Sequence, residues 1–285
     1  MRIDRERRGN DRSCRRWLLV AGMLLVVGWS GPGGPAVPSA SAQAQTQAQV
    51  QLQGQVPMPT QAPAPARTYP QLGGEYVVIS GGPAVRRWED LRRPSEQHDR
   101  WWGNFIRPAR MRFEELREQY GPQAPITWLV YREGYVRRAR EEGRPLVDFV
   151  VSVRDRHQVR LIWFDSGQEV IDYLNRGQNR SSMPIVGLEF FGHSNKHCWM
   201  FDYSNDNLGV SRSWLHEDEF SRLRRGAFAR NAYVRSWGCH TAESMSAKFR
   251  RHTGVTMIGA VGKTDYRALA DGILPVISDG GYWVY

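Results

Sequence analysis

The feature that most restricts the fold is a series of six short apolar segments, separated by longer stretches with helical periodicity. Each segment is continuously apolar, as strands buried on both faces of a sheet usually are. Strands that alternate with helices favour a mainly parallel sheet with helices on both sides. We therefore predict an α/β fold, a three-layer sandwich around a mainly parallel, roughly six-stranded sheet. The predicted strands are Tyr76–Ile79, Ile126–Tyr131, Val159–Phe164, Ile185–Phe191, Ala232–Trp237 and Thr256–Ala260.

Four stretches have the periodicity or the end signals of helices. Ser166 is a candidate N-cap for one of them, and Gly254 stands where a helix end favours glycine. Pro108 falls inside another, and we expect that helix to break or kink there. The predicted helices are Asp99–Tyr120, Ser166–Asn175, Ser213–Phe228 and Thr241–His252. Two further segments, 271–277 and 282–285, are candidate edge strands.

The N-terminus has the three parts of a secretory signal peptide. Seven arginines precede the apolar run Trp17–Trp29, and the small-residue site Ala40-Ser41-Ala42 follows it. Because the apolar run is short for a bilayer-spanning helix, we expect residues 1–42 to be removed by cleavage near Ala42. The protein is then exported, either to the periplasm or as a secreted protein. The alternative is an uncleaved N-terminal membrane anchor.

Residues 43–70 are rich in glutamine, alanine and proline and carry almost no charge. This composition is typical of a disordered linker. From about residue 71 the composition becomes globular and contains no repeat of fixed period. We therefore predict a single folded domain over residues 71–285.

The net charge of the chain is +10, from 39 basic and 29 acidic side chains. Only three of the basic residues are lysine, the arginines are spread along the chain, and no nucleic-acid-binding motif accompanies them. We therefore expect no nucleic-acid partner. Contact with a membrane is expected only through an uncleaved signal segment, and the sequence does not indicate an oligomeric state.

Two reactive side chains follow two of the predicted strands directly. His193 comes two positions after the strand that ends at Phe191, and Cys239 comes two positions after the strand that ends at Trp237. The carboxyl ends of parallel strands meet at one edge of a sheet, so we expect these side chains to lie together. A cysteine at a strand-to-helix turn is well placed to react as a thiolate, and a nearby imidazole can take its proton. The pattern indicates acyl-transfer chemistry without a cofactor.

The residues that flank this pair are candidates for supporting it. Gly192 and Gly238 precede the histidine and the cysteine and allow the backbone to approach a substrate closely. The backbone N–H of Cys239, together with that of Ser194, is expected to face a developing oxyanion. Asn195 is a candidate for orienting the imidazole.

The stretch Ser236–Ser244, with the Ile258-Gly259-Ala260 segment that follows it, resembles the corresponding run of the clan CD cysteine peptidases. This family includes the caspases, legumains, gingipains, separases and CHAT-type domains. The segment Tyr76–Gly82 is similar to the opening strand of that fold, so the resemblance spans about residues 76–266. It implies a caspase-like fold and an endopeptidase that acts on a protein or peptide substrate, with Cys239 as the nucleophile and His193 as the general acid and base.

One position departs from the family pattern. Those peptidases usually have glycine directly after the histidine, whereas this chain has Ser194 there and Gly192 before the histidine. The departure bears on the oxyanion geometry, and two other functions therefore stay open. One is a catalytically inactive caspase-like module that binds a partner, and the other is a different Cys–His amidase that acts on cell-wall material.

Other interpretations of Cys239 also stay open. A free cysteine is often a buried structural thiol. Cys198 is the other cysteine expected to remain after signal cleavage, and an exported protein with two cysteines often pairs them in a disulfide. Zinc binding by these cysteines with His193, His197 and His240 does not match the usual ligand spacings, so we expect no metal.

Several residues near the predicted site are candidates for substrate binding. Trp199 belongs to an apolar segment beyond the His193 loop, which either lines a groove or forms a packed hairpin. An acidic side chain can receive a basic side chain of the substrate, although solvated surface acids are commoner. The acids are Asp202, Asp206, Glu243 and Asp265. Hydroxyls that either orient the site or cap the following helix are those of Ser236, Thr241, Ser244 and Thr264.

Overall fold

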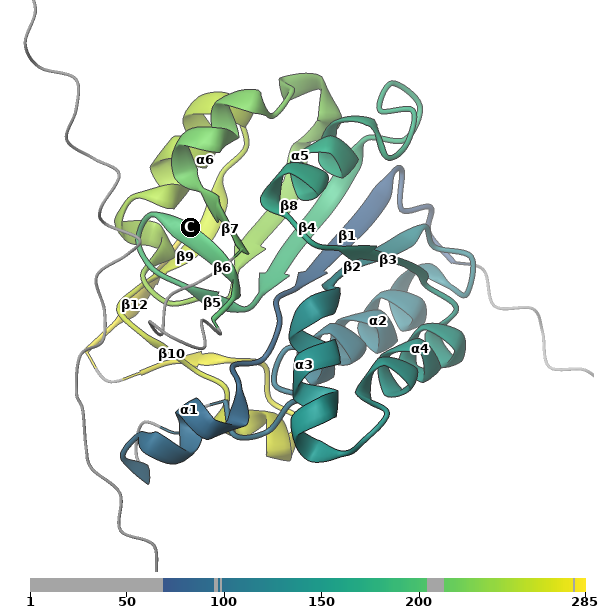
Figure 1. Ribbon diagram of the computed structural model, residues 1–285. Coiled ribbons are helices and arrows are strands. Elements are labelled where there is room, and N and C mark those ends of the chain that lie inside the picture. The colour runs from purple at the N-terminus through teal and green to yellow at the C-terminus, as the bar shows by residue number, and fades with distance from the viewer. Residues whose placement is uncertain (1–68, 95–96, 98, 204–212, 279) are drawn as a thin grey trace, which may run out of the picture. The chain divides into compact units, whose positions relative to one another are not determined.

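The structure is a computed structural model that describes residues 69–285, apart from 95–96, 98, 204–212 and 279. The predicted signal peptide, almost all of the predicted linker and Asp206 lie outside the described residues. Among the described residues, seven strands form a central sheet in the order β12-β9-β8-β4-β1-β2-β3 (Figure 1). All neighbouring strands run parallel except β12, which is antiparallel to β9. The α/β fold class and the mainly parallel sheet are confirmed.

All six predicted strands are present in the central sheet. They are β1 (Glu75–Ser80), β2 (Ile126–Tyr131), β3 (Arg160–Phe164), β4 (Ile185–Phe191), β8 (Phe228–Ser236) and β9 (Met257–Val261). The seventh strand is β12 (Tyr282–Val284), which the sequence indicated as a candidate edge strand. The expected number of six is therefore one too low.

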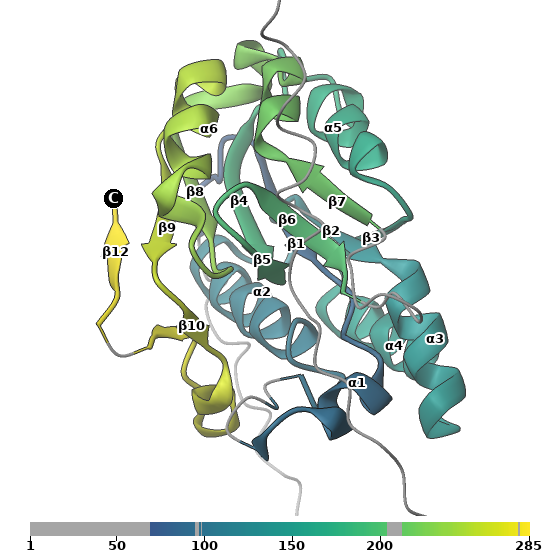
Figure 2. The ribbon, with the colours of Figure 1, turned by 60° about the vertical axis from the view of Figure 1, so that its left-hand side comes forward.

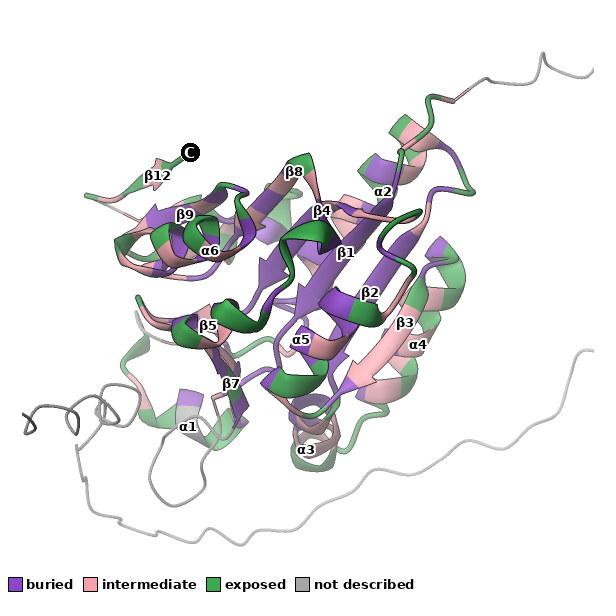
Figure 3. Cartoon of the chain, turned by 90° about the horizontal axis from the view of Figure 1, so that it is seen from above, coloured by how far each residue is buried: buried purple, intermediate pink, exposed green. Residues whose placement is uncertain are grey.

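Helices cover both faces of the sheet (Figure 1, Figure 2). The helices on one face are α2 (Ile106–Tyr120), α3 (Arg132–Glu142) and α4 (Leu146–His157), and those on the other are α5 (Gly167–Arg176) and α6 (Met245–Thr253). Val77 and Ile79 of β1 pack into the core with α5 and α6, whereas Tyr76 and Val78 pack into the core with α2, α3 and α4. The central strands β1, β2 and β4 are accordingly buried in the middle of the fold, whereas β3 at one edge is only partly buried (Figure 3). Burial on both faces explains their continuously apolar sequences.

The predicted kink at Pro108 is wrong. Helix α2 begins at Ile106, so Pro108 lies in its first turn, where the missing N–H costs no helical hydrogen bond. Residues 99–105 form turns instead of the predicted first part of the helix.

The predicted helix Ser213–Phe228 is also wrong. Its first residues form β7 (Ser213–His216), which pairs antiparallel with β6 (Cys198–Asp202). Leu215 is fully buried and Trp214 is exposed, an alternation that suits a strand. Two 3₁₀ helices follow, η2 (Glu217–Arg222) and η3 (Arg225–Ala227), and Phe228 already belongs to β8.

The remaining two predicted helices are confirmed. Ser166 caps α5 by accepting a hydrogen bond from the N–H of Glu169 at 3.4 Å. The second stretch divides into the 3₁₀ helix η4 (Thr241–Glu243) and α6, which ends at Gly254 in the left-handed conformation (φ 81°). Three helices are present that the sequence did not indicate: α3, α4 and the short α1 (Arg86–Leu91).

Two small sheets lie at the carboxyl ends of the central strands (Figure 2). One contains β5 (His193–Ser194), β6 and β7. The other pairs β10 (Thr264–Asp265) with β11 (Val276–Ile277), and the 3₁₀ helix η5 (Arg267–Asp271) lies between them in the chain. No helix in the described part of the chain is long and apolar enough to cross a membrane.

Candidate active site

The strand order brings the two predicted reactive residues to the same edge of the sheet. From β1 the chain adds β2 and β3 on one side, whereas β4, β8 and β9 extend the sheet on the other, and ligands of such sheets bind near this reversal. Phe190 of β4 is paired with Ser236 of β8. His193 and Cys239 each come three positions later. The loops that carry them therefore leave the sheet side by side, and the N–H of Trp237 donates to the carbonyl of Phe190 at 2.9 Å.

A third residue, Asp99, joins the pair from the segment between α1 and α2, in the connection from β1 to β2. Its Oδ2 lies 2.8 Å from Nε2 of His193, and the carboxylate is almost completely buried. The backbone N–H of Ala84 also donates to Oδ2, and the side-chain amide of Asn104 donates to Oδ1 at 3.3 Å. Because Nε2 contacts Asp99, proton transfer by this imidazole would have to use Nδ1.

The environment keeps Asp99 ionised. Burial raises the pKa of this carboxyl, but the positive charge of His193, the hydrogen bonds from His193 and Ala84 and the charge of Arg138 outweigh burial and lower the pKa overall. A charged Asp99 can hold the imidazole in one orientation and stabilise it when it is protonated.

The loop that carries Asp99 is fixed by two other buried side chains. The N–H of Asp99 donates to Oε2 of Glu89 in α1 at 2.9 Å. The guanidinium of Arg138, from α3, donates to the carbonyls of Ala84 at 2.6 Å and Asp99 at 3.3 Å. Burial raises the pKa of Glu89. The position of the carboxylate is therefore set by α1 and α3.

The imidazole of His193 lies among aromatic rings. The ring of Tyr203 stacks on it at 4.7 Å, and Phe105 meets it edge-on at 5.0 Å. The His193 side chain is 13% exposed. The base is thus mostly shielded from water but still accessible.

Cys239 carries a free, half-buried thiol, so the alternative disulfide with Cys198 is not formed. The N–H of Thr264, at the start of β10, donates to Sγ at 3.4 Å, and its hydroxyl lies 3.5 Å from Sγ. No acceptor among the described residues takes the backbone N–H of Cys239, which leaves it available to a substrate oxygen. His240 has φ 62°, a left-handed conformation that is uncommon for a residue other than glycine. Such outliers concentrate at functional sites.

Ser194 and Gly238 contact each other between the two loops. The hydroxyl of Ser194 donates to the carbonyl of Cys239 at 2.7 Å. A Cβ atom at Gly238 would lie 2.1 Å from Oγ of Ser194. Glycine is therefore required at 238 as long as serine stands at 194. The same loops meet again at Tyr266, whose hydroxyl donates to the carbonyl of Trp237 at 3.2 Å.

One predicted supporting residue, Asn195, and two predicted substrate-binding residues, Trp199 and Asp202, have other tasks. Oδ1 of Asn195 accepts the N–H groups of His197 and Cys198, each at 2.8 Å, so Asn195 closes the β5–β6 turn and Asp99 orients the imidazole instead. Trp199 is 1% exposed and belongs to the core, where its indole donates to Ser236 at 3.1 Å. Asp202 is buried and pairs with the guanidinium of Arg137.

The other predicted acids and hydroxyls are also engaged within the chain. Glu243 hydrogen-bonds His240 at 2.6 Å and accepts the N–H of Gly262 at 3.1 Å. Asp265 pairs with Arg267. Thr241 accepts the N–H of Ala260 at 3.4 Å, so Thr264 is the hydroxyl that contacts the sulfur.

The histidines and cysteines do not form a metal site in the described residues. His197 is hydrogen-bonded to Glu217 at 2.9 Å, and Cys198 is fully buried.

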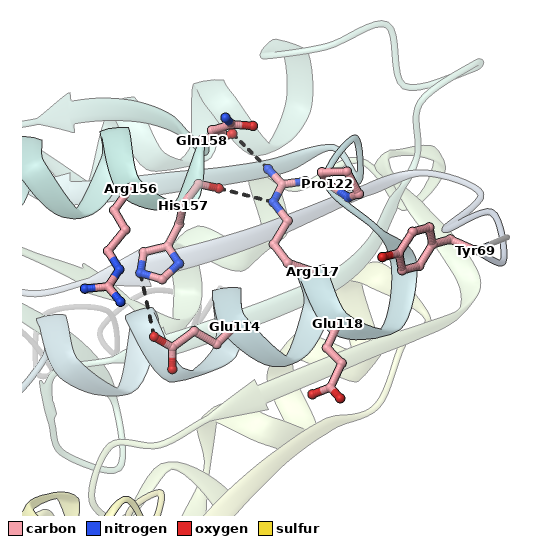
Figure 4. A pocket seen from close by; sticks show the side chains of 8 residues that line it. All are labelled: Tyr69, Glu114, Arg117, Glu118, Pro122, Arg156, His157 and Gln158. Carbon is pink, nitrogen blue, oxygen red and sulfur yellow. Dashed lines mark hydrogen bonds and ion pairs between the residues drawn. The ribbon is translucent and has the colours of Figure 1, made fainter. Parts of the chain in front are cut away.

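An open pocket lies at the opposite edge of the sheet, next to the ends of α2 and α4 (Figure 4). Glu114, Arg117 and His157 are among its lining residues. Arg117 donates to main-chain carbonyls, and burial lowers the pKa of His157. The pocket contains neither a nucleophile nor a contact with the Cys239 loop.

Comparison with known proteins yields no match to a protein-family model, a curated protein or a solved structure.

Sequence reasoning missed Asp99 as a member of the site. It lies 94 positions before His193, in a polar segment that follows no predicted strand directly. A single sequence gives no local signal for a buried carboxylate of this kind.

Proposed function

We propose that this protein is an exported cysteine endopeptidase with a caspase-like three-layer fold, in which Cys239, His193 and Asp99 act as a triad. The observation that carries the proposal is the contact of 2.8 Å between buried Asp99 and Nε2 of His193, on a loop that starts beside the Cys239 loop. A buried carboxylate that orients an imidazole is the arrangement that makes a neighbouring thiol a nucleophile.

In the proposed reaction, Nδ1 of His193 takes the proton from Sγ of Cys239, and the sulfur attacks the carbonyl carbon of a peptide bond. The oxygen of the tetrahedral intermediate accepts the backbone N–H of Cys239. His193 then gives its proton to the leaving amine, which leaves an acyl-thioester on Cys239. A water molecule, deprotonated by His193, hydrolyses the thioester and restores the thiol. Asp99 stays ionised throughout and stabilises the imidazolium.

The test combines a thiol probe with a peptide library. Folded protein is expected to be labelled by an iodoacetamide probe at Cys239 much faster than denatured protein, and to cleave peptides in the library. H193A should abolish both. H197A is the matched control, because His197 follows His193 by four positions but its ring pairs with Glu217. Equal labelling of folded and denatured protein contradicts the proposal.

An inactive binding module is the second candidate, and Ser194 is the observation that favours it. Its hydroxyl is bonded to the carbonyl of Cys239, where the resembled peptidases usually have glycine after the histidine. If the protein is inactive for this reason, S194G will show neither peptide cleavage nor altered thiol reactivity. Release of fragments from cell-wall material but not from peptides would instead identify a cell-wall amidase.

A further inference from the structure

Trp237 links the end of β8 to Gly238 and Cys239, and its polar atoms are all bonded. Its N–H donates to Phe190 at 2.9 Å and its carbonyl accepts from Tyr266 at 3.2 Å. Its indole N–H donates to Oε2 of Glu189 at 2.6 Å. The indole ring also stacks on Phe191, with ring centres 5.7 Å apart and planes 12° apart. Trp237 therefore has one permitted orientation.

Glu189 lies in the middle of β4, with no exposed surface. Its Oε1 accepts a hydrogen bond from Arg112 of α2 at 2.6 Å and another from the hydroxyl of Tyr76. Because the indole N–H of Trp237 donates to Oε2, each carboxylate oxygen of Glu189 accepts at least one hydrogen bond. A buried ion pair of this type often contributes little net stability compared with apolar side chains of the same volume. Its value here is that it fixes the direction of the indole N–H.

We propose that Glu189 and Trp237 are positioning residues for the Cys239 thiol; this inference rests on the proposed function of that thiol. Trp237 is separated from Cys239 by Gly238 alone, and glycine lets the backbone rotate freely unless its neighbours are fixed. The Glu189–Trp237 hydrogen bond supplies that constraint from inside the sheet. The constraint limits where the sulfur can lie relative to His193 and to a substrate carbonyl, as attack on that carbonyl requires.

The test uses two conservative variants. W237F keeps an aromatic ring on Phe191 but loses the N–H, and E189Q keeps the shape of the carboxylate but loses its charge. E75Q is the matched control. Glu75 is equally buried in the sheet and pairs with Arg180 at 2.6 Å, but it lies at the amino end of β1, at the other edge of the sheet.

The readout is the rate constant for alkylation of Cys239 by iodoacetamide across a pH series, measured by mass spectrometry on full-length protein that circular dichroism shows to be folded. W237F and E189Q are expected to lower the rate constant at neutral pH by about tenfold or more, as expected for misplacement of a reacting atom. Their pH profiles should move towards that of denatured protein. E75Q should lower the midpoint of thermal unfolding to a similar extent and keep the wild-type profile.

The outcomes separate this inference from the proposed function. An activated wild-type thiol with unchanged profiles in both W237F and E189Q overturns the inference and leaves the proposed function standing. An equal change in E75Q also overturns it, because the effect would then follow from lost stability alone. A wild-type thiol no faster than that of denatured protein overturns both.

Discussion

At the residue scale, Asp99 holds Nε2 of His193, so proton transfer by the imidazole would use Nδ1. The change D99N keeps the size of the side chain, but an amide can no longer stabilise the imidazolium and can present the wrong group to Nε2. We expect kcat/KM for a cleaved peptide to fall by about 10²- to 10⁴-fold, by analogy with the same change in a serine-protease triad. E243Q is the control, because Glu243 pairs with the half-exposed His240 beside Cys239. A D99N enzyme within twofold of wild type would remove Asp99 from the mechanism.

The lowered pKa of Asp99 also predicts how stability depends on pH. A carboxyl whose pKa is lower in the folded state stabilises the fold above its unfolded pKa of about 4, and this contribution is lost as the pH falls through the folded pKa. The difference in unfolding free energy between wild type and D99N should therefore persist from pH 7 to about pH 5 and shrink below about pH 4. Urea unfolding at a series of pH values measures it. A difference that already disappears between pH 7 and pH 5 would show that the pKa is raised.

The contact between Ser194 and Gly238 predicts coupling between two substitutions. G238A places a Cβ atom 2.1 Å from Oγ of Ser194, and we expect this overpacking to cost about 1–3 kcal/mol of unfolding free energy. S194G removes that atom, so the double variant should lose less stability than the sum of the two single variants. Urea unfolding of the four proteins gives the coupling energy. Strict additivity would mean that the loops are not in contact.

Residues differ in how far a single sequence reveals their role. The closeness of the His193 and Cys239 loops could be predicted because each loop directly follows a strand, and parallel strands bring such positions together. The position of Asp99 beside His193 could not be predicted, because the two residues are 94 positions apart in the chain. Asn195 was assigned the orienting role for its closeness in sequence, whereas its side chain bonds the turn beside it.

At the element scale, continuous apolar strands could be predicted and helices with charged buried faces could not. The strands are buried on both sides, so nearly every residue is apolar. Helix α3 is rich in arginine and glutamate, and one of its buried residues is Arg138. The side chain of Arg138 is buried because its guanidinium hydrogen-bonds the loop that carries Asp99. A helix that buries a hydrogen-bonded arginine lacks the apolar periodicity by which a helix is recognised in a sequence.

The hydrogen bonds from Arg138 of α3 to the loop that carries Asp99 predict the effect of R138K. The guanidinium bonds several carbonyls and Glu142 at once, and a lysine ammonium cannot reproduce this planar set. We expect R138K to lose about 3 kcal/mol of unfolding free energy, the scale of a broken buried pair, and to slow the alkylation of Cys239. R180K is the control, because Arg180 is also buried and bonds Glu75 and two carbonyls remote from the site. Equal slowing in R180K would show that α3 has no specific role in the site.

At the scale of the whole molecule, the site depends on the order of the strands. Asp99, His193 and Cys239 lie in the connections that follow β1, β4 and β8, with α1 between β1 and Asp99. These three strands are neighbours in the sheet although they are distant in the chain. The fold class could be predicted from the alternation of apolar strands with helices. The order of the strands in the sheet could not, because apolar strands of similar length have similar sequence patterns.

The N-terminal segment gives the last prediction, which concerns the form in which the molecule functions. A basic segment, a short apolar run and Ala40-Ser41-Ala42 predict export and cleavage after Ala42. The exported protein should then have the mass of a chain whose first residue is Gln43. A40L/A42L should accumulate as uncleaved precursor, because bulky side chains do not fit a small-residue cleavage site. If the segment is instead a membrane anchor, wild type and variant will both be found at full-length mass in the membrane fraction. Intact-mass measurement of the soluble and membrane fractions separates the two, and a cleaved, exported wild type is the form in which Cys239 should be assayed.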